Sequence, residues 1–478
     1  MKELKMYIDG KFVDNQSGKW INVLNPSTEE VISLMPDGTI EDARRAIDAA
    51  QKAQPAWEAL TSTQRAGFLK KIAQGIRRRE QELTDIIVRE GGKTQALANV
   101  EVNFTADYID YMAGWALRYE GEIVPSERPN ETIFVYKKPI GVTTGILPWN
   151  FPFFLIARKA APALLTGNTI VVKPSQITPE NAYVFAQAVE EAGVPSGVFN
   201  IVNGRGSVIG HELAANPKVG MVSLTGSVGA GIQTMAAASA NVTKVSLELG
   251  GKAPGIVMAD ADLDLAVKSI IASRVINTGQ VCNCCERVYV HASVKDEFMK
   301  KLIAGMQAVK VGNPAEVKEL DMGPLVEAGA LKSVEEKVAK ALAQGAKLEC
   351  GGHRIGTKGY FFEPTVLSGC TQKMDIIQEE TFGPVLPVVE FTDVEEAIAW
   401  ANDCEYGLTS SVYTQNLDMA FKLTRSLKFG ETYVNRENFE AMQGFHAGWR
   451  KSGIGGADGK HGLEEYLQTH VVYLETQI

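Results

Sequence analysis

Short runs of β-branched residues alternate with helical patterns between residues 142 and 240, and this alternation limits the folds open to the chain. The β-like runs lie at residues 142–146, 169–172, 198–202 and 220–224, and the helical patterns lie near residues 153–165, 179–192, 207–215 and 229–240. A helix between successive strands returns the chain to the same edge of the sheet, so the strands run parallel. The pattern therefore predicts an α/β fold with a doubly wound parallel sheet.

A second region of alternating strands and helices extends from residue 253 to about residue 435. Its expected strands are residues 255–258, 287–290, 385–391, 410–413 and 432–435, and its helices lie near residues 263–274, 294–309, 328–344 and 394–402. A chain of 478 residues is too long for one compact domain, so we expect two or three. Residues 436–460 are rich in Gly, Phe, His and Trp, lack periodicity and are expected to form an ordered functional loop.

The remaining segments predict short strands, amphipathic helices and an exposed arm. Short alternating runs separated by turns cover residues 7–35, and helical spacing follows at residues 41–54, 63–79, 81–90 and 99–118. Residues 132–139 are β-rich and end in Lys-Lys-Pro, which is typical of an exposed strand that can pair with another subunit. A final strand is expected at residues 470–474.

The charge balance excludes several classes of partner. The formal net charge is −9 and the sequence pI is about 5.4, whereas binding to nucleic acid or to an anionic membrane needs a basic face. The most apolar run, residues 151–165, is interrupted by Arg158, Lys159 and Pro162, and the N-terminus has no continuous apolar region. We therefore expect a cytoplasmic protein whose partners are small molecules or other subunits.

Three of the six cysteines lie within four positions, at Cys282, Cys284 and Cys285. A thiol on a tight loop, here after Thr-Gly-Gln, can act as a nucleophile. The same spacing also resembles a C-x-x-C metal or redox pair, but a structural zinc needs four ligands and the other thiols are scattered, so no metal is expected. The scattered cysteines favour reduced thiols over a disulfide framework.

A glycine-rich turn at residues 224–231 offers a candidate phosphate site. It follows an expected strand and precedes an expected helix, where backbone N–H groups can approach a phosphate. The glycine spacing is G-x2-G-x-G and not G-x-G-x-x-G, so a simple packing turn explains the turn equally well.

Four separated motifs resemble the aldehyde dehydrogenase superfamily: PWNFP at residues 148–152, LELGGK at 247–252, GQVC at 279–282 and EETFGP at 379–384. The resemblance covers nearly the whole chain, from about residue 7 to residue 473. It implies the aldehyde dehydrogenase fold, with a Rossmann-like NAD-binding domain, an α/β catalytic domain and a small β bridging arm. The resemblance implies that residues 1–118 and 140–250 form the NAD-binding domain, residues 251–464 the catalytic domain, and residues 119–139 with 465–478 the bridging arm. It also implies a homodimer or homotetramer.

The resemblance also implies catalytic roles. Cys282 attacks the aldehyde carbonyl and forms a thiohemiacetal, while the Asn150 amide and the Cys282 backbone N–H stabilise the oxyanion. Glu248 activates the water that hydrolyses the later thioester, which favours a free acid over transfer to coenzyme A. In isolation, Asn150 also fits a turn position and Glu248 a buried structural carboxylate. A structural or binding protein on the same fold is the non-enzymatic alternative, and the presence of all three residues argues against it.

The residues that the resemblance assigns to the cofactor are Lys173, Gln176, Gly226, Ser227, Glu380, Phe382 and Trp149. Gln176 stands where NAD-preferring relatives usually have a glutamate. A carboxylate there binds ribose hydroxyls and repels a 2′-phosphate, whereas the amide removes the repulsion. We expect NAD as the cofactor, with some use of NADP.

The residues that the resemblance assigns to the substrate are Arg158, His446, Glu440 and Phe151. Polar side chains in place of aromatic ones favour a short hydroxyaldehyde, lactaldehyde or glycolaldehyde, oxidised to the carboxylic acid. The alternative is a semialdehyde such as succinate semialdehyde, with Arg158 binding its carboxylate. Arg158 also fits an ion pair on a helix surface.

The neighbouring thiol of Cys284 raises a further question. A reversible disulfide between Cys282 and Cys284 would inactivate the protein under oxidising conditions. A bystander thiol is the preferred interpretation, because a bridge between residues so close in one loop is often strained.

Overall fold

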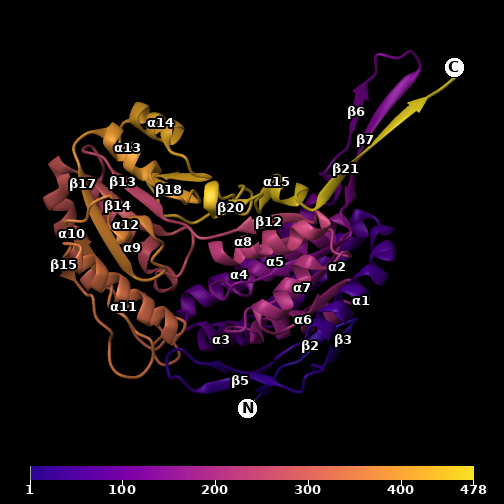
Figure 1. The fold of residues 1–478 in the computed structure, drawn as a ribbon, viewed down its shortest axis with the longest axis horizontal. Helices are drawn as coiled ribbons and strands as arrows, with labels where there is room; N and C mark the ends of the chain where they lie inside the picture. Colours follow the sequence, from indigo (N-terminus) through magenta and orange to yellow (C-terminus); the bar gives the residue numbers. More distant parts are fainter. Residues whose placement is uncertain (1, 478) are drawn as a thin grey trace.

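A computed structural model describes residues 2–477. Within these residues the chain forms an eight-stranded sheet, a seven-stranded sheet and two three-stranded sheets. Figure 1 shows two lobes, one built on each large sheet, and an arm that projects from one of them. The described residues contain no helix that is long and apolar enough to cross a membrane.

The eight-stranded sheet contains the predicted parallel strands. The parallel strands are β12 (Lys244–Glu248), β11 (Met221–Thr225), β8 (Val142–Ile146), β9 (Thr169–Lys173) and β10 (Phe199–Ile201), in that spatial order. Antiparallel strands flank them: β20 (Gly453–Ile454) at one edge, and β2 (Met6–Ile8) and β3 (Lys11–Val13) at the other. The prediction of a parallel sheet is thus confirmed for its centre, and β12 is a strand that the sequence pattern did not predict.

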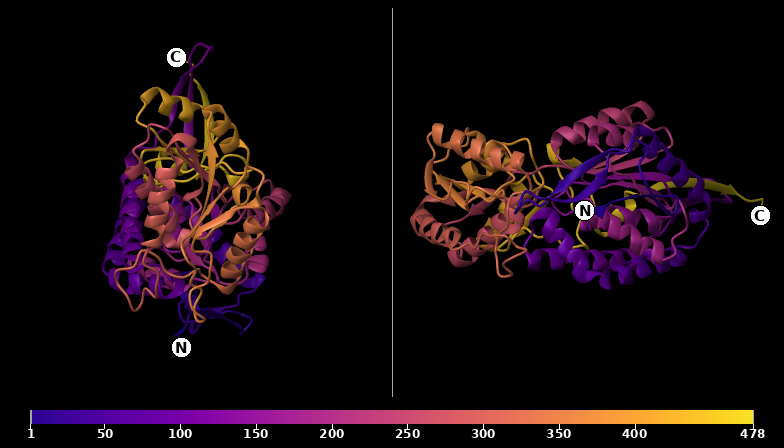
Figure 2. Two further views of the ribbon diagram at one scale, coloured as in Figure 1. Left: turned by 90° about the vertical axis from the view of Figure 1, so that its left-hand side faces the viewer. Right: turned by 90° about the horizontal axis from the view of Figure 1, so that it is seen from below.

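Helices cover both faces of this sheet (Figure 2). Along β9, Ile170 and Val172 pack in one core cluster and Val171 in another, because successive side chains point to opposite faces. One cluster contains residues of α2 (Ser62–Arg77), α3 (Glu80–Gly91), α4 (Gln95–Ala113), α5 (Phe154–Thr166) and α6 (Glu180–Glu191). The other contains residues of α1 (Ile40–Glu58) and α7 (His211–Ala215), and α8 (Val228–Ala238) packs beside α7.

Local sequence determines where the first helices begin. Thr39 accepts a hydrogen bond from the Asp42 backbone N–H and the Asp42 side chain accepts one from Thr39, which is a capping box before α1. Thr61 and Gln64 form the same motif before α2. These caps satisfy N–H groups that have no partner within the helix.

The seven-stranded sheet forms the second lobe. Its spatial order is β15 (Lys347–Cys350), β16 (Thr365–Ser368), β17 (Val385–Phe391), β14 (Cys285–His291), β13 (Ala253–Val257), β18 (Thr409–Tyr413) and β19 (Glu431–Val434), and only the β15 pairing is antiparallel. Its helices are α9 (Leu263–Val275), α10 (Lys295–Gln307), α11 (Ala328–Ala343), α12 (Asp375–Gln378), α13 (Val394–Asn402) and α14 (Leu417–Ser426). The sequence pattern did not predict β15, β16, α12 or α14.

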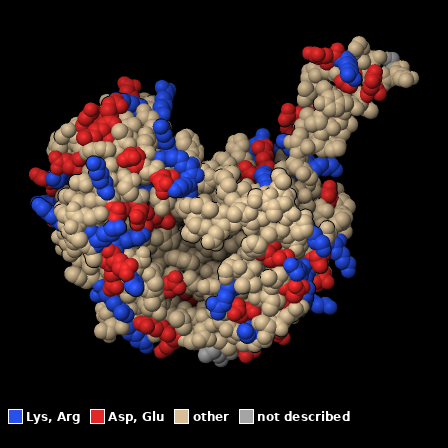
Figure 3. Space-filling model, viewed as in Figure 1, with Lys and Arg blue, Asp and Glu red and all other residues tan. Residues whose placement is uncertain are grey.

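Smaller sheets lie outside the two lobes' central sheets. Strands β1 (Lys2–Glu3), β5 (Val31–Pro36) and β4 (Trp20–Leu24) form one of them. In the arm, β21 (Leu467–Glu475) pairs with β7 (Glu131–Pro139), which pairs with β6 (Glu122–Pro125). Figure 3 shows acidic and basic side chains mixed over both lobes, whereas the shaft of the arm carries few of them below its charged tip.

The connections between the lobes bring particular strand ends together. Strands β8, β11 and β12 end, at their carboxyl termini, near residues 146, 225 and 248. Strands β13, β14 and β17 begin at residues 253, 285 and 385. The motifs at residues 148–152, 279–282 and 379–384 therefore lie between the carboxyl edge of the first sheet and the amino edge of the second, and the motif at residues 247–252 covers the end of β12 and the loop that follows it. The carboxyl edge of the strands is a usual place for a ligand in α/β proteins.

Candidate active site

A strained turn before β14 presents Cys282. Asn277, Thr278 and Gly279 are all left-handed, with φ of 46°, 61° and 73°. The left-handed conformation costs roughly 1–2 kcal/mol for a residue other than glycine, so the turn needs support from its surroundings. Arg274 supplies part of it by donating a hydrogen bond to the Gly279 carbonyl.

Side chains of the same turn attach it to other segments. Asn277 Nδ2 lies 3.2 Å from the Asn150 carbonyl oxygen. Thr278 donates to the Gly323 carbonyl over 3.0 Å, and Gln280 Oε1 accepts from the Val326 backbone N–H over 2.9 Å. The turn is thereby attached to both lobes, and the partly exposed Cys282 follows it.

Two cavities meet at Cys282. One, which we call the apolar pocket, has about 730 Å³ of empty space and is lined by residues that include Leu97, Phe104, Phe151, Phe154, Arg158, Glu248, Phe439, Glu440 and His446. The other, which we call the groove, has about 900 Å³ and is lined by residues that include Trp149, Gly226, Ser227, Lys337, Glu380 and Phe382. Asn150, Thr225 and Cys282 line both cavities. A thiol at this junction is accessible to one ligand from each side.

Glu248 lies at the carboxyl end of β12 and lines the apolar pocket. It is 4% exposed, and among the described residues neither of its carboxylate oxygens has a hydrogen-bond partner. Burial raises the pKa of Glu248 to about 7, although nearby cationic side chains, foremost His446, act to lower it. A buried carboxyl group with no hydrogen-bond partner in the protein, and with a pKa near neutrality, is suited to exchange protons with water or a ligand.

His446 lies between two carboxylates. Its Nδ1 is 2.7 Å from Glu431 Oε1 and its Nε2 is 3.5 Å from Glu248 Oε2. Burial acts to lower the pKa of His446, but the carboxylates of Glu431 and Glu248 outweigh it and hold that pKa well above its usual range. The two carboxylates therefore favour the cationic form of His446, which lies beside the Glu248 carboxylate in the apolar pocket.

Arg158 on α5 is buried and paired. Its Nε donates to Asp458 over 2.9 Å, its Nη2 also binds Asp458, and Nη2 lies 3.1 Å from Glu440 Oε1. The side chain is 5% exposed, so the expectation of an ion pair on a helix surface is wrong. The α5 sequence carries apolar residues around the whole helix, and all of α5 is buried. Glu440 also accepts a hydrogen bond from Asn283, which joins it to the Cys282 loop.

Asn150 is 6% exposed and lies in the loop after β8. Its Nδ2 donates to the Gln280 carbonyl over 3.1 Å. An amide nitrogen has two hydrogens, so this contact leaves one of them for a ligand. Its Oδ1, like the hydroxyl of Thr225, is buried and has no hydrogen-bond partner within residues 2–477.

The groove has features that fit a dinucleotide. Ser227 is the N-cap of α8 and accepts from the Ala230 backbone N–H, and a side chain added at Gly229 would meet nothing within 4 Å, so the helix N-terminus is open to an anion. The rings of Trp149 and Phe382 meet edge to face at 5.5 Å. Glu380 Oε1 accepts from the Gly251 backbone N–H over 2.8 Å, which orients a carboxylate suited to ribose hydroxyls.

Lys173 and Gln176 lie beyond the residues that line the groove. Lys173 ends β9, donates to the Pro174 carbonyl and is buried, and burial lowers its pKa to about 8. Gln176 follows it on the surface. The Leu147 backbone N–H donates to the Lys173 carbonyl, so both residues belong to the same sheet edge as the PWNFP loop.

Cys284 and Cys285 differ from Cys282 in their surroundings. Both are buried, and burial raises the pKa of each thiol to about 12. The Cys284 thiol also donates to the Val281 carbonyl over 2.8 Å. A thiol held in this state is a poor partner in disulfide exchange, which argues against a reversible disulfide with Cys282 and favours the bystander interpretation. Among the described residues, no group of three His, Cys, Asp or Glu side chains is arranged to hold a metal.

The family model described as "Aldehyde dehydrogenase family" matches residues 12–472. The chain belongs to the aldehyde dehydrogenase family. Among curated members of the family, it is 65% identical to lactaldehyde dehydrogenase of Escherichia coli over 471 residues, which cover 98% of each chain. It is 39% identical to the succinate-semialdehyde dehydrogenase [NADP(+)] of the same organism over 461 residues, 96% of this chain and 95% of that one.

Solved structures of family members have the same fold. Lactaldehyde dehydrogenase from Escherichia coli superposes with a TM-score of 0.98 at 65% identity, with 99% of each chain covered. A 3,6-anhydro-L-galactose dehydrogenase in complex with NAP superposes with a TM-score of 0.97 at 44% identity, and the match covers 99% of this chain and 100% of that one. A betaine aldehyde dehydrogenase from Staphylococcus aureus in complex with NAD+ superposes with a TM-score of 0.97 at 36% identity, and the match covers 99% of this chain and 95% of that one. The expected aldehyde dehydrogenase fold is thereby confirmed.

Several residues of the site were not predicted from the sequence. Asp458 and Glu431 hold Arg158 and His446, and Thr225 lines both cavities. Glu101 lines the apolar pocket and accepts hydrogen bonds from the backbone N–H groups of Phe153 and Phe154 at the start of α5. None of these residues belongs to a motif that points to the site. A glutamate on the buried face of an amphipathic helix, as at Glu101, does suggest a specific polar partner.

The contact between Gly251 and the Cys282 backbone yields a first prediction. A Cβ added at Gly251 would lie 2.3 Å from the Cys282 carbonyl oxygen, so Gly251→Ala must displace the loop. We expect a destabilisation of about 1–3 kcal/mol and alkylation of Cys282 by iodoacetamide about tenfold slower than in the wild type, because the thiol leaves the junction.

Gly67→Ala is the matched control, because a Cβ at Gly67 in α2 meets nothing within 4 Å. It should raise stability by about 0.5–1 kcal/mol and leave the alkylation rate unchanged. Peptide mass spectrometry assigns the alkylated cysteine. Wild-type alkylation kinetics at Cys282 in Gly251→Ala would contradict the expected displacement.

Proposed function

We propose that this aldehyde dehydrogenase oxidises a short 2-hydroxyaldehyde, lactaldehyde or glycolaldehyde, to the free acid with NAD. The observation that carries the proposal is the surroundings of Arg158, whose charge is already matched by Asp458 and Glu440 in a pocket that ends at a thiol. The 65% identity to lactaldehyde dehydrogenase supports the same substrate class.

In the proposed first step, the Cys282 thiolate attacks the aldehyde carbon and forms the C–S bond. The carbonyl oxygen takes the negative charge and accepts hydrogen bonds from the Asn150 Nδ2 and the Cys282 backbone N–H. Removing one such donor typically costs about 3 kcal/mol of barrier. A free thiol has a pKa of about 8.5, so only a small fraction is ionised at neutral pH without local assistance.

NAD held in the groove would supply the acceptor for the hydride of the thiohemiacetal carbon, and loss of that hydride leaves the acyl group on Cys282 as a thioester. Glu248 then removes a proton from water, the resulting hydroxide attacks the thioester carbon, and the Cys282 thiolate leaves. The product is the carboxylic acid. The buried carboxylate of Glu248, which has no hydrogen-bond partner among the described residues, supports its role as this base.

The proposed cofactor site follows the groove. Gly226 and Ser227 at the start of α8 hold the pyrophosphate, and Glu380 and Phe382, with Trp149, hold the nicotinamide riboside. Lys173 and Gln176 at the same sheet edge hold the adenosine ribose. Because Gln176 is neutral, it does not repel a 2′-phosphate, so NADP serves as a second, weaker cofactor.

Arg158 also distinguishes the two substrate classes. A semialdehyde carboxylate would need an unmatched cation, whereas this guanidinium already binds Asp458 and Glu440. The hydroxyl of a short hydroxyaldehyde can instead exchange hydrogen bonds with Glu440 and His446. Phe151, with Lys93 Nζ 3.7 Å above its ring, forms part of the apolar wall.

We propose the following organisation of the chain. Residues 1–118 and 140–250 form the cofactor domain, residues 251–464 the catalytic domain, and residues 119–139 with 465–478 a bridging arm. The arm exposes apolar side chains, with Ile123 at 72% and Tyr473 at 66%, which supports its use in a homodimer or homotetramer. The six cysteines are free thiols, which supports a cytoplasmic location.

The pKa of Glu248 predicts a pH dependence. Because only the ionised carboxyl accepts a proton from water, kcat for lactaldehyde oxidation should rise with pH through about 7 and fall about tenfold per pH unit well below it. A rapid-quench measurement of thioester hydrolysis at each pH reports this step directly. A hydrolysis rate that stays constant from about pH 6 to about pH 8 would contradict the role of Glu248.

The substrate proposal is tested by comparing kcat/KM for lactaldehyde and succinate semialdehyde. We expect a preference for lactaldehyde of about a hundredfold or more. Glu440→Gln should reduce that ratio, because it removes one of the carboxylates that match Arg158 and a partner for the substrate hydroxyl.

Glu437→Gln is the control for this comparison. Glu437 pairs with Arg436 near the surface and does not line the apolar pocket, so both kcat/KM values should stay within about twofold of the wild type. Equal kcat/KM values of the wild type for lactaldehyde and succinate semialdehyde would favour the semialdehyde alternative and overturn the proposal.

A further inference from the structure

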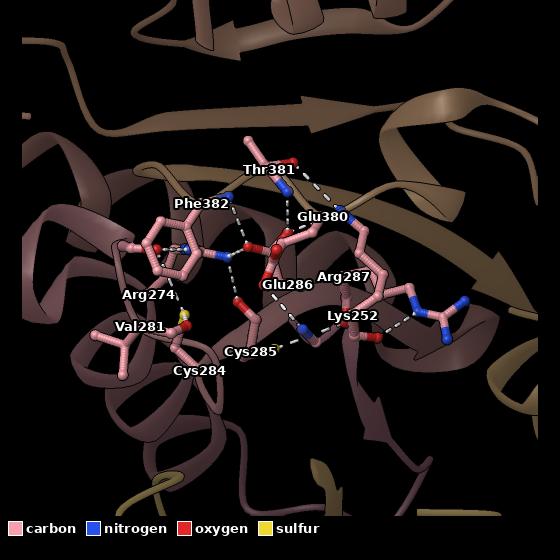
Figure 4. Close-up of polar contacts among 12 residues, drawn as sticks. Lys252, Arg274, Val281, Cys284, Cys285, Glu286, Arg287, Glu380, Thr381 and Phe382 are labelled. Atoms are coloured by element: carbon pink, nitrogen blue, oxygen red, sulfur yellow. Dashed lines mark hydrogen bonds and ion pairs between the residues drawn. The ribbon is translucent and has the colours of Figure 1, made fainter. Parts of the chain in front are cut away.

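Glu286, the second residue of β14, is bonded to two cations and to the backbone of a distant loop (Figure 4). Its Oε2 lies 2.8 Å from Lys252 Nζ and its Oε1 lies 2.9 Å from Arg274 Nη1. It also accepts hydrogen bonds from the backbone N–H groups of Thr381, over 2.9 Å, and Phe382, over 3.1 Å. Glu286 is 1% exposed, and it has no part in the proposed reaction steps.

The two cations are attached to the loops of the reacting groups. Lys252 follows Glu248 by four residues, and its Nζ also lies 3.2 Å from Thr381 Oγ1. Arg274 donates to the Cys285 carbonyl over 2.9 Å and to the Gly279 carbonyl, on either side of Cys282. Through these cations, Glu286 is fixed relative to both the base and the nucleophile.

The loop that Glu286 holds contains the groove residues Glu380 and Phe382. Phe382 is left-handed, with φ of 53°, a conformation that is unfavourable outside glycine and needs external support. The hydrogen bonds from Thr381 and Phe382 to Glu286 supply that support at the strained residue itself. In Figure 4 the Phe382 side chain projects from this turn above the Cys282 loop segment at Val281 and Cys284.

The charge on Glu286 is permanent under ordinary conditions. Burial opposes its ionisation, but Arg274 and Lys252 lower the pKa of Glu286 to about 2. Hydrogen bonds to a charged acceptor are stronger than those to a neutral one. Net stability is a weak reason for such a cluster, since buried ion pairs are often no better for stability than apolar side chains of similar volume. The arrangement instead fixes the direction of the bonds to the turn.

We propose that Glu286 is a positioning residue for the cofactor, which holds the Glu380–Phe382 turn at a fixed place relative to Glu248 and Cys282. The inference rests on the proposed function, because Glu380 and Phe382 are there assigned to the nicotinamide riboside. The contact of Glu380 and Phe382 with the cofactor would then depend on Glu286, a carboxylate that touches neither the cofactor nor the aldehyde.

Glu286→Gln tests the proposal in the full-length protein. The amide keeps the shape but loses the charge and one acceptor, so the turn is held less firmly. We expect the Kd for NADH, measured by fluorescence titration without aldehyde, and the KM for NAD to rise about tenfold. The KM for lactaldehyde should stay within about twofold.

Glu90→Gln is the matched control, because Glu90 is also fully buried and accepts backbone hydrogen bonds, from Glu180 and Asn181 at the start of α6. Glu90 does not line the apolar pocket or the groove. Its replacement should lower the thermal unfolding midpoint without changing the Kd for NADH. If Glu286→Gln behaved in the same way, Glu286 would be a structural residue only and the proposal would be overturned.

Glu286→Asp keeps the test decisive if Glu286→Gln does not fold. Aspartate keeps the charge for Lys252 and Arg274 but is one methylene too short to reach both N–H groups of the turn. A raised Kd for NADH would support the proposal, and an unchanged Kd would overturn it. A wild-type chain that binds NADH but does not oxidise lactaldehyde would count against the proposed substrate alone, since the NADH titration still decides the role of Glu286.

Discussion

The short crossing between β12 and β13 is the constraint on which the rest of the site depends. It leaves the first sheet at Glu248 and enters the second sheet at Ala253, and its glycines leave no room for side chains. A Cβ at Gly250 would lie 2.6 Å from Glu380 Oε2, and one at Gly251 would lie 2.3 Å from the Cys282 carbonyl oxygen. Because the backbone of this crossing contacts the Cys282 backbone and the Glu380 side chain, the carboxylate at the end of one sheet, the thiol loop before the other and the carboxylate of the groove come close to one another.

Identical side chains acquire different chemistry from their surroundings in this region. Glu248 has no hydrogen-bond partner among the described residues and a pKa near 7, so it can accept and release a proton. Glu286 is equally buried, but its two cations keep it ionised at any ordinary pH. Cys282 is partly exposed at the junction of two cavities, whereas burial raises the pKa of Cys284 to about 12. The neighbouring charges and the exposure of a side chain, and not its residue type, therefore distinguish the groups proposed to react from those that are held in one state.

Sequence periodicity predicted most of the long helices and the central parallel strands of the first sheet, and it missed several short elements. The central strands β8 to β11 read clearly as β-branched runs, whereas β12 alternates Lys, Ser and Glu with apolar residues. Helix α14 has only ten residues, and Leu423 is the one among them that is buried. Arg158 and Asp458 are 300 positions apart, and no local pattern indicates such a pair. The proposed catalytic and cofactor residues came from the resemblance to the family, and the ion pairs of Arg158 and His446 required the structure.

The central claim is that Cys282 carries the acyl group and that Glu248 removes it. The direct measurement is to mix Glu248→Gln with lactaldehyde and NAD, quench in acid and determine the mass of the cysteine peptides. We predict one lactoyl group on Cys282 per NADH formed in the first turnover, because the thioester forms but is not hydrolysed. NADH formation without an acyl group on Cys282, or with the group on Cys284 or Cys285, would contradict the account.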